Sequence, residues 1–152
     1  MSGLLENVKL ITIGSPNKYL SAYEEPIIHQ LSFDKTKNID NGKTYISLKF
    51  LAGGKYADSK GYIVTPTVYQ ADSPDHWLFN YENFGPVLAI YVYPDAEWKS
   101  ILEKVDQSSG GFTLTNAVFA NSRAAIREAE DALQYSVGNF YIIRKTTVAL
   151  IG

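Results

Sequence analysis

The sequence predicts an α/β domain in which helices flank a mostly parallel sheet. The second half alternates strand, helix, strand, helix and strand, with short connections marked by glycine. This order is typical of βαβ units, whose strands run parallel. The run Val87–Tyr93 is nearly all apolar, as expected for a strand covered on both faces. At 152 residues the chain suits one domain with a continuous core.

The first helix of the second half is predicted after Val87–Tyr93. Asp95 is expected to cap it. Its apolar stripe at helical spacing consists of Trp98, Ile101, Leu102 and Val105.

A strand and a second helix are predicted next. The strand lies within Phe112–Ala120, and Asn121 or Ser122 caps the helix. The apolar face of this helix carries Ala125, Ile126, Ala129 and Leu133. After Gly138, Phe140–Ile143 is expected to form another buried strand.

The first half is less regular. We expect a helix around Leu4–Val8 and a short one at Ser32–Lys37, with Ser32 as its cap. Tyr45–Leu51 alternates as a strand does. Tyr62–Tyr69 is rich in β-branched and aromatic residues but contains Pro66. Because proline donates no ladder hydrogen bond, this strand is expected at an edge or with a bulge.

Composition excludes several classes of partner and site. The net charge is -2, and lysine and arginine are dispersed, so neither nucleic acid nor an anionic membrane is expected to bind. No run is long and apolar enough to span a membrane. There is no cysteine, which removes disulfides, thiolate metal ligands and cysteine nucleophiles from this chain.

Few residues have a pattern that predicts chemistry. His29 and His76 are far apart and have no ligand-spaced companions, so no metal site is expected. No Gly-x-Ser-x-Gly turn supports a serine nucleophile. The segment Glu82–Pro86 stands out, because a carboxylate and an aromatic ring precede a Gly-Pro turn. It is either only a turn before a strand, or a place where Glu82 binds a sugar diol and Phe84 packs against a ring.

Several stretches resemble the aldehyde dehydrogenase superfamily, and within it the fungal-type delta-1-pyrroline-5-carboxylate dehydrogenases. These are FGPVLAIYVYPDAEWKSILEKVDQSS, GGKYADSKGYIVTPTVY, LTNAVFANSRAAIREAEDALQYSVGNFYI and the shorter IGSPNKYL, PIIHQLSFDK and FLAGGK. Together they cover most of the chain. The resemblance implies that residues 1–152 form part of an aldehyde dehydrogenase catalytic domain, a single domain truncated at both ends.

The resemblance also implies a reaction. Members oxidise L-glutamate γ-semialdehyde to L-glutamate with NAD in proline breakdown, in the mitochondrial matrix of eukaryotes. A cysteine thiolate attacks the aldehyde, hydride passes to NAD, and an activated water releases the acid. Glu82 matches the family glutamate that binds the nicotinamide ribose, and Phe84 matches the aromatic residue beside the nicotinamide.

Other positions depart from the family pattern. Val148 and Ala149 occupy the substrate-carboxylate loop where glycine followed by serine or alanine is usual. Valine disfavours positive φ and crowds such an anion-binding loop. Asn116 stands where glycine is usual, and Ile143 where asparagine is usual. The catalytic cysteine and the glycine-rich cofactor half have no counterpart in these residues.

Two functions follow as expectations. One is a portion of the dehydrogenase that is catalytically inactive by itself, with NAD and a small-molecule substrate as the ligands of its family. The alternative is a non-catalytic module that pairs with or regulates a full-length dehydrogenase. A homo-oligomer or an association with a full-length relative is the corresponding expectation for partners, and apolar surface marks such interfaces.

Overall fold

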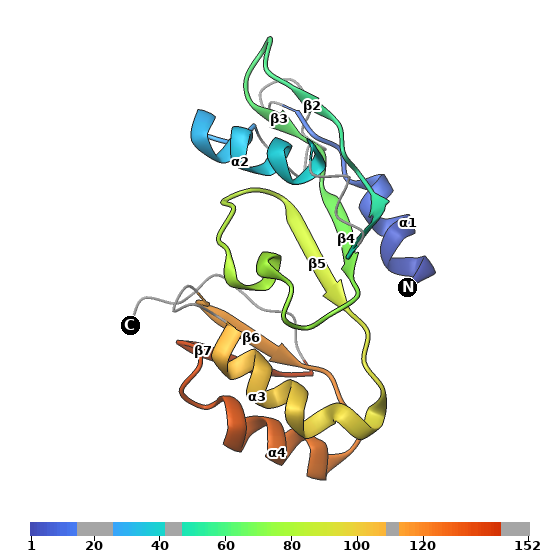
Figure 1. The fold of residues 1–152 in the computed structure, drawn as a ribbon, viewed down its shortest axis with the longest axis vertical. Coiled ribbons are helices and arrows are strands. Elements are labelled where there is room, and N and C mark those ends of the chain that lie inside the picture. The colour runs from blue at the N-terminus through green and yellow to red at the C-terminus, as the bar shows by residue number, and fades with distance from the viewer. Residues whose placement is uncertain (15–25, 42–46, 109–112, 144–152) are drawn as a thin grey trace. The chain divides into compact units, whose positions relative to one another are not determined.

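The computed structural model describes residues 1–14, 26–41, 47–108 and 113–143. The chain divides into two compact units, each described separately below (Figure 1). The first comprises Met1–Ser73 and Glu82–Val92, and the second Pro74–Tyr81 and Tyr93–Gly152. Each unit contains helices and a pair of parallel strands, which confirms the α/β class. No helix among the described residues has the length and apolar character needed to cross a membrane.

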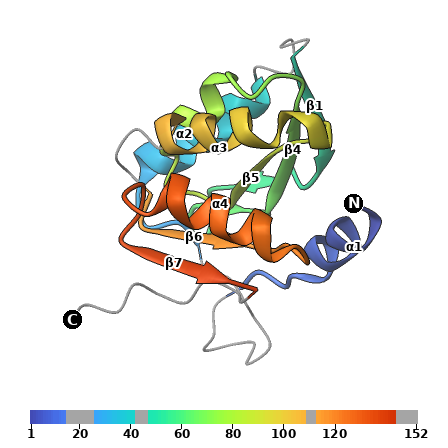
Figure 2. The same ribbon diagram turned by 90° about the horizontal axis from the view of Figure 1, so that it is seen from below.

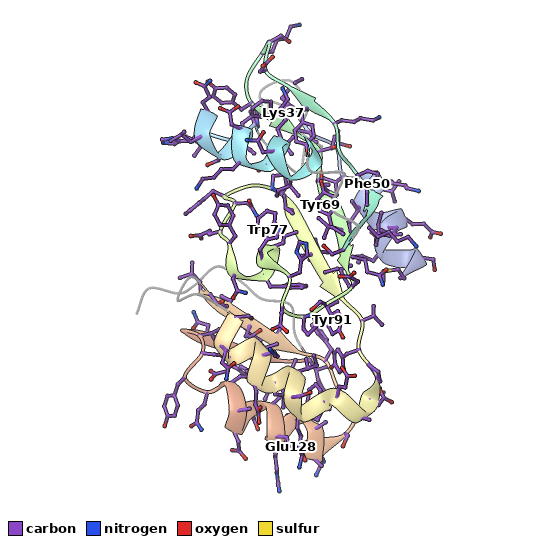
Figure 3. All side chains as sticks on the ribbon, viewed as in Figure 1. Lys37, Phe50, Tyr69, Trp77, Tyr91 and Glu128 are labelled. Atoms are coloured by element: carbon purple, nitrogen blue, oxygen red, sulfur yellow. The ribbon has the colours of Figure 1, made fainter. Side chains whose placement is uncertain are left out.

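In the part of the first unit that the structure describes, the larger sheet has three strands in the order β1, β4 and β5. β4 (Thr67–Ala71) pairs antiparallel with β1 (Leu48–Ala52) and parallel with β5 (Val87–Tyr91). Phe50 and Tyr69 are partners across β1 and β4, and their ring centroids are 6.0 Å apart (Figure 3). β4 is buried at all but one of its positions, as expected for a central strand.

Pro66 breaks a strand that the sequence predicted as continuous. Instead of one strand over Tyr62–Tyr69, the structure has β3 (Ile63–Val64), which pairs antiparallel with β2 (Tyr56–Ala57), and then β4. Of the two predicted alternatives, the edge position was wrong, since β4 is central. A register irregularity lies in the pairing of β4 with β1, between Phe50 and Ala52. The ladder cannot run through a residue without an N–H, so it stops before Pro66 and resumes after it.

β5 is confirmed as a strand with a parallel neighbour, but the prediction that both its faces are covered was wrong for the described residues. None of its five residues is buried, and Leu88 is 43% exposed. In the described part of the chain β5 is the last strand of its sheet.

Among its described residues, the first unit has two α-helices. α1 (Ser2–Leu10) has no buried residue. α2 (Gln30–Asn41) is longer than the predicted Ser32–Lys37, so Ser32 lies within the helix and is not its cap. Among the residues of α2 whose burial is described, the buried ones are spaced three apart, which places them on one face: Phe33, Thr36 and Ile39.

The second unit packs two helices against a parallel pair of strands. α3 (Trp98–Ser108) and α4 (Arg123–Leu133) contact one another, and β6 (Thr115–Val118) pairs parallel with β7 (Asn139–Ile142). Figure 2 shows α4 alongside β6 and β7. The core contains Leu102, Ala129 and Leu133, with Trp98, Val105, Val118 and Phe140 packed against it. Both predicted apolar helix faces are therefore confirmed.

Of the two helix caps predicted in this unit, one is confirmed and the other is wrong. Ser122 caps α4, because its hydroxyl accepts a hydrogen bond from the Ala125 N–H at 3.4 Å. Asp95 does not cap a helix: it opens a short 3₁₀ turn, η2 (Asp95–Glu97), that precedes α3. The N-cap of that turn is Pro94, which makes no side-chain cap bond.

Candidate functional site

The segment Glu82–Pro86 leads directly into β5 and is tied to the neighbouring strand. The Thr67 N–H donates to the Pro86 carbonyl at 2.8 Å, and the Val87 N–H donates to the Gly85 carbonyl at 2.8 Å. Phe84 has a φ of 49°, in the left-handed region that few non-glycine residues adopt. Its side chain is 70% exposed. The segment therefore presents an aromatic ring on a well-anchored turn.

A hollow of about 500 Å³ lies beside this turn. Its lining is mainly apolar and comes from two stretches of the first unit: Pro26, Ile27, Ile28, His29, Ser32, Phe84, Gly85 and Pro86. Two of these, His29 and Ser32, provide a ring nitrogen and a hydroxyl at the start of α2. The hollow can therefore hold a flat apolar group with a polar substituent.

The site residues predicted from the sequence are placed as follows. Phe84 lines the hollow, whereas Glu82 is half-buried and is not among its lining residues. Val148 and Ala149 lie outside the described residues. Sequence reasoning missed the contribution of Ile27 and Ser32, because no spacing relates the start of α2 to a turn more than fifty residues later.

An exposed aromatic ring and a half-buried carboxylate two residues apart match the chemistry of a nicotinamide riboside. The ring of Phe84 offers a flat apolar surface, and a carboxylate such as that of Glu82 accepts hydrogen bonds from a ribose diol. The structure places only Phe84 of this pair at the hollow.

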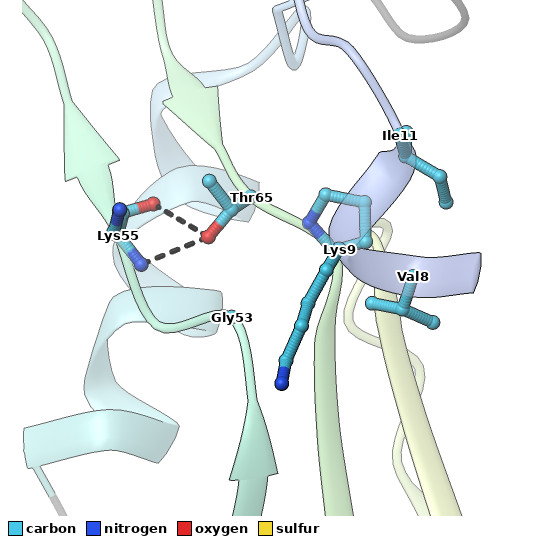
Figure 4. A pocket seen from close by; sticks show the side chains of 7 residues that line it. Val8, Lys9, Ile11, Gly53, Lys55 and Thr65 are labelled. Carbon is cyan, nitrogen blue, oxygen red and sulfur yellow. Dashed lines mark hydrogen bonds between the residues drawn. The ribbon is translucent and has the colours of Figure 1, made fainter. Parts of the chain in front are cut away.

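A second hollow of the first unit, of about 410 Å³, contains none of the predicted site residues. It is lined by Val8, Lys9, Ile11, Gly53, Lys55, Thr65 and Pro66 (Figure 4). The Thr65 hydroxyl accepts from the Lys55 N–H at 2.9 Å and lies 3.4 Å from the Lys55 carbonyl. These bonds connect the residue before β2 to the residue after β3. These polar groups of the hollow therefore serve to hold the two strands together.

The two histidines have separate environments. His76 is buried, and its Nδ1 accepts a hydrogen bond from the Leu78 N–H at 3.2 Å at the start of η1 (Trp77–Asn80). His29 is exposed and lines the hollow beside Phe84. Among the described residues, no group of three histidine, cysteine or acidic side chains is arranged to hold a metal ion.

Comparison with known proteins identifies the family. The model of the aldehyde dehydrogenase family matches residues 1–150. The mitochondrial delta-1-pyrroline-5-carboxylate dehydrogenase of Emericella nidulans is 43% identical over 148 residues, which are 95% of this chain and 26% of that protein. The human mitochondrial delta-1-pyrroline-5-carboxylate dehydrogenase is 37% identical over 150 residues, 98% of this chain and 26% of that protein.

A solved structure agrees with these relatives. The delta-pyrroline-5-carboxylate dehydrogenase from Mycobacterium tuberculosis, bound with NAD, superposes with a TM-score of 0.84 at 36% identity. The match covers 99% of this chain and 27% of that chain. This chain thus spans about a quarter of the length of the relatives it matches. The resemblance inferred from the sequence is confirmed, and the chain belongs to the aldehyde dehydrogenase family.

Proposed function

We propose that the chain is a portion of the catalytic domain of an NAD-dependent dehydrogenase that oxidises L-glutamate γ-semialdehyde to L-glutamate in proline breakdown. The observation that carries this proposal is the alignment of nearly the whole chain with delta-1-pyrroline-5-carboxylate dehydrogenases. In this proposal residues 1–152 are one incomplete domain. The mitochondrial names of its relatives support a mitochondrial matrix location.

The proposed roles in cofactor binding fall on the turn before β5. The Glu82 carboxylate accepts hydrogen bonds from the nicotinamide ribose, and the Phe84 ring packs against the nicotinamide. NAD, when bound, supplies the hydride acceptor. Val148 and Ala149, which lie outside the described residues, are the proposed substrate-binding positions.

The chain is proposed to be inactive by itself. The family reaction forms a covalent bond between the aldehyde carbon and a cysteine sulfur. The 152 residues contain no cysteine, so the residues of this chain can position ligands but cannot form that bond.

Nicotinamide binding tests the role of Phe84. Nicotinamide mononucleotide is titrated into the labelled chain and followed by NMR, comparing wild type with Phe84→Ala and Phe119→Ala. Phe119 is a matched control, being 69% exposed against 70% for Phe84. Because aromatic stacking contributes about 0.5–1.5 kcal/mol, Phe84→Ala should weaken binding roughly 2- to 10-fold. Equal binding by all three proteins, or no binding by wild type, would contradict the assignment.

The second candidate is a non-catalytic module that pairs with a full-length dehydrogenase or regulates it. The exposed apolar side chains at the start of α2 and on β5 favour it: Ile28 is 92% exposed, and Leu31 and Leu88 are exposed as well. Size-exclusion chromatography of the chain with and without a full-length relative separates the two candidates. Co-elution supports the module, and an unchanged monomer peak in the mixture argues against it.

A further inference from the structure

We infer that Thr36, on α2, is the positioning residue that sets the conformation of Phe84 through its contact with Gly85. The inference rests on the proposed cofactor role of Phe84 and adds a residue from a distant part of the chain to it. Three features support the inference. The Thr36 side chain is fixed in place, Gly85 packs closely against it, and the neighbouring Phe84 has an uncommon backbone conformation.

Thr36 is fixed in place by burial and by hydrogen bonds. Its exposed fraction is 1%. Its hydroxyl donates to the Ser32 carbonyl at 2.8 Å, and its own carbonyl accepts from the Tyr56 hydroxyl at 3.4 Å. A threonine side chain has few χ1 choices in a helix. Rotating the Oγ1 away would break the hydrogen bond to the Ser32 carbonyl. The Thr36 side chain is therefore held in one position, against which Gly85 packs.

Gly85 approaches this surface more closely than any other residue type could. A Cβ at position 85 would overlap the Oγ1 of Thr36. Its next neighbours, the Cδ1 of Ile27 at 3.4 Å and the Cβ of Thr36 at 3.5 Å, are ordinary contacts. Among the described residues, the glycines with positive φ are Gly53, Gly54 and Gly61, and Gly85 is not one of them. Position 85 therefore favours glycine because of one oxygen atom on α2, and not because of a left-handed φ.

The packing of Gly85 against Thr36 restricts the backbone conformation of Phe84. After Gly85, the Pro86 carbonyl is hydrogen-bonded to the Thr67 N–H on β4, and before Phe84, Asn83 is buried. Between the buried Asn83 and the packed Gly85, Phe84 takes a φ of 49° and leaves its ring exposed beside the hollow. A left-handed conformation costs a non-glycine residue free energy, so it persists only while the contact with α2 holds.

Variants that enlarge the residue at position 85 and reduce the one at position 36 test the inference. The variants are Gly85→Ala, the double variant Thr36→Ala with Gly85→Ala, and the double variant Thr36→Ser with Gly85→Ala. Serine keeps the Oγ atom and alanine removes it, so only the alanine pair opens the space that the methyl group added at position 85 needs. The readouts are the three-bond amide-to-Hα coupling and the ¹³C shifts of Phe84, with amide exchange in α2 as the check on folding.

The three variants should have different effects on the backbone conformation of Phe84. Gly85→Ala should move the Phe84 couplings away from their left-handed values, the alanine pair should restore them, and the serine pair should not. The inference is wrong if Gly85→Ala leaves the couplings unchanged, or if the serine pair rescues them as well as the alanine pair.

A second readout separates this inference from the cofactor role. Nicotinamide mononucleotide should perturb the Phe84 ring signals in wild type and in the alanine pair, and at least twofold less in Gly85→Ala at the same concentration. If wild-type Phe84 does not respond, the cofactor role fails, whereas the positioning role is still decided by the backbone couplings. If Gly85→Ala responds as strongly as wild type, the positioning role is wrong.

Discussion

Ile143 combines a β-branched side chain with a backbone conformation that such residues rarely adopt. Its φ is 51°, its N–H donates to the Val118 carbonyl at 2.8 Å, and its side chain is exposed. The left-handed conformation costs an L-residue about 1–2 kcal/mol, and asparagine is one of the few that visit it routinely. Asparagine, which the family resemblance implies at this position, would adopt this conformation at a lower cost.

Ile143→Asn should stabilise the second unit. Relief of the backbone strain is expected to raise the free energy of unfolding by about 0.5–1 kcal/mol, because little apolar burial is lost from an exposed side chain. Urea unfolding measures this change. Ile142→Asn, one residue earlier in the extended strand β7, is the control and should destabilise. A loss of stability in Ile143→Asn as large as in the control would contradict the explanation.

The phenol of Tyr93 has a raised pKa. Burial, and secondly the Asp95 carboxylate, raise the pKa of Tyr93 above its ordinary value of 10.0. Both causes disfavour the phenolate. A raised native pKa means that this contribution to stability is complete below the unfolded pKa and is lost as the pH rises through the native one.

Asp95→Asn should lower the Tyr93 pKa without returning it to the ordinary value, because the burial remains. NMR titration of the tyrosine ring carbons at alkaline pH follows this. Asp106→Asn serves as the control and should leave the pKa of Tyr93 unchanged. A pKa that does not move in Asp95→Asn would assign the whole shift to burial.

At the scale of elements, the second unit depends on close packing between α3 and α4. Ala129 is completely buried, and its helix contributes Leu133 to the same cluster. On the outer side, the Trp98 indole N–H donates to the Glu128 carboxylate at 3.0 Å. A small residue at position 129 allows the two helices to approach, since side-chain volume sets the distance between packed helices.

Ala129→Leu should therefore loosen the second unit, and Ala132→Leu, at an exposed position of the same helix, should not. Overpacking costs about 1–3 kcal/mol, so amides of α3 and α4 should exchange roughly 5- to 150-fold faster in Ala129→Leu. Amide exchange followed by mass spectrometry measures both variants. Equal exchange in the two would show that position 129 is not tightly packed.

The sequence predicted helices well where hydrophobic periodicity was strong, and was less reliable where a single residue decided the geometry. The apolar stripes of α3 and α4 and the parallel strands β6 and β7 follow from patterns of four or more residues. Asp95 and Ser32 were each interpreted alone as helix caps, and both interpretations were wrong, whereas Ser122, one of two candidates, is the cap of α4. A capping residue and its neighbours have similar propensities, so only the hydrogen bonds identify the true helix start.

At the scale of the whole molecule, the family could be predicted from the sequence and the surroundings of the candidate site could not. Glu82 and Phe84 were predicted as cofactor-binding residues from a local segment and stay a prediction. The partner of that segment, Thr36, lies on another element, and no local pattern relates the two. The left-handed φ of Phe84 is likewise a product of tertiary contacts, because propensity alone disfavours it.

The most direct test of the proposed function is NADH formation by the purified 152-residue chain with L-glutamate γ-semialdehyde and NAD. The chain has no cysteine, so NADH should accumulate no faster than in a protein-free blank, while the full-length Emericella nidulans enzyme turns over in the same assay. Sustained NADH formation by the chain above the blank, with substrate carbon covalently attached to another side chain in intact mass spectra, would contradict it.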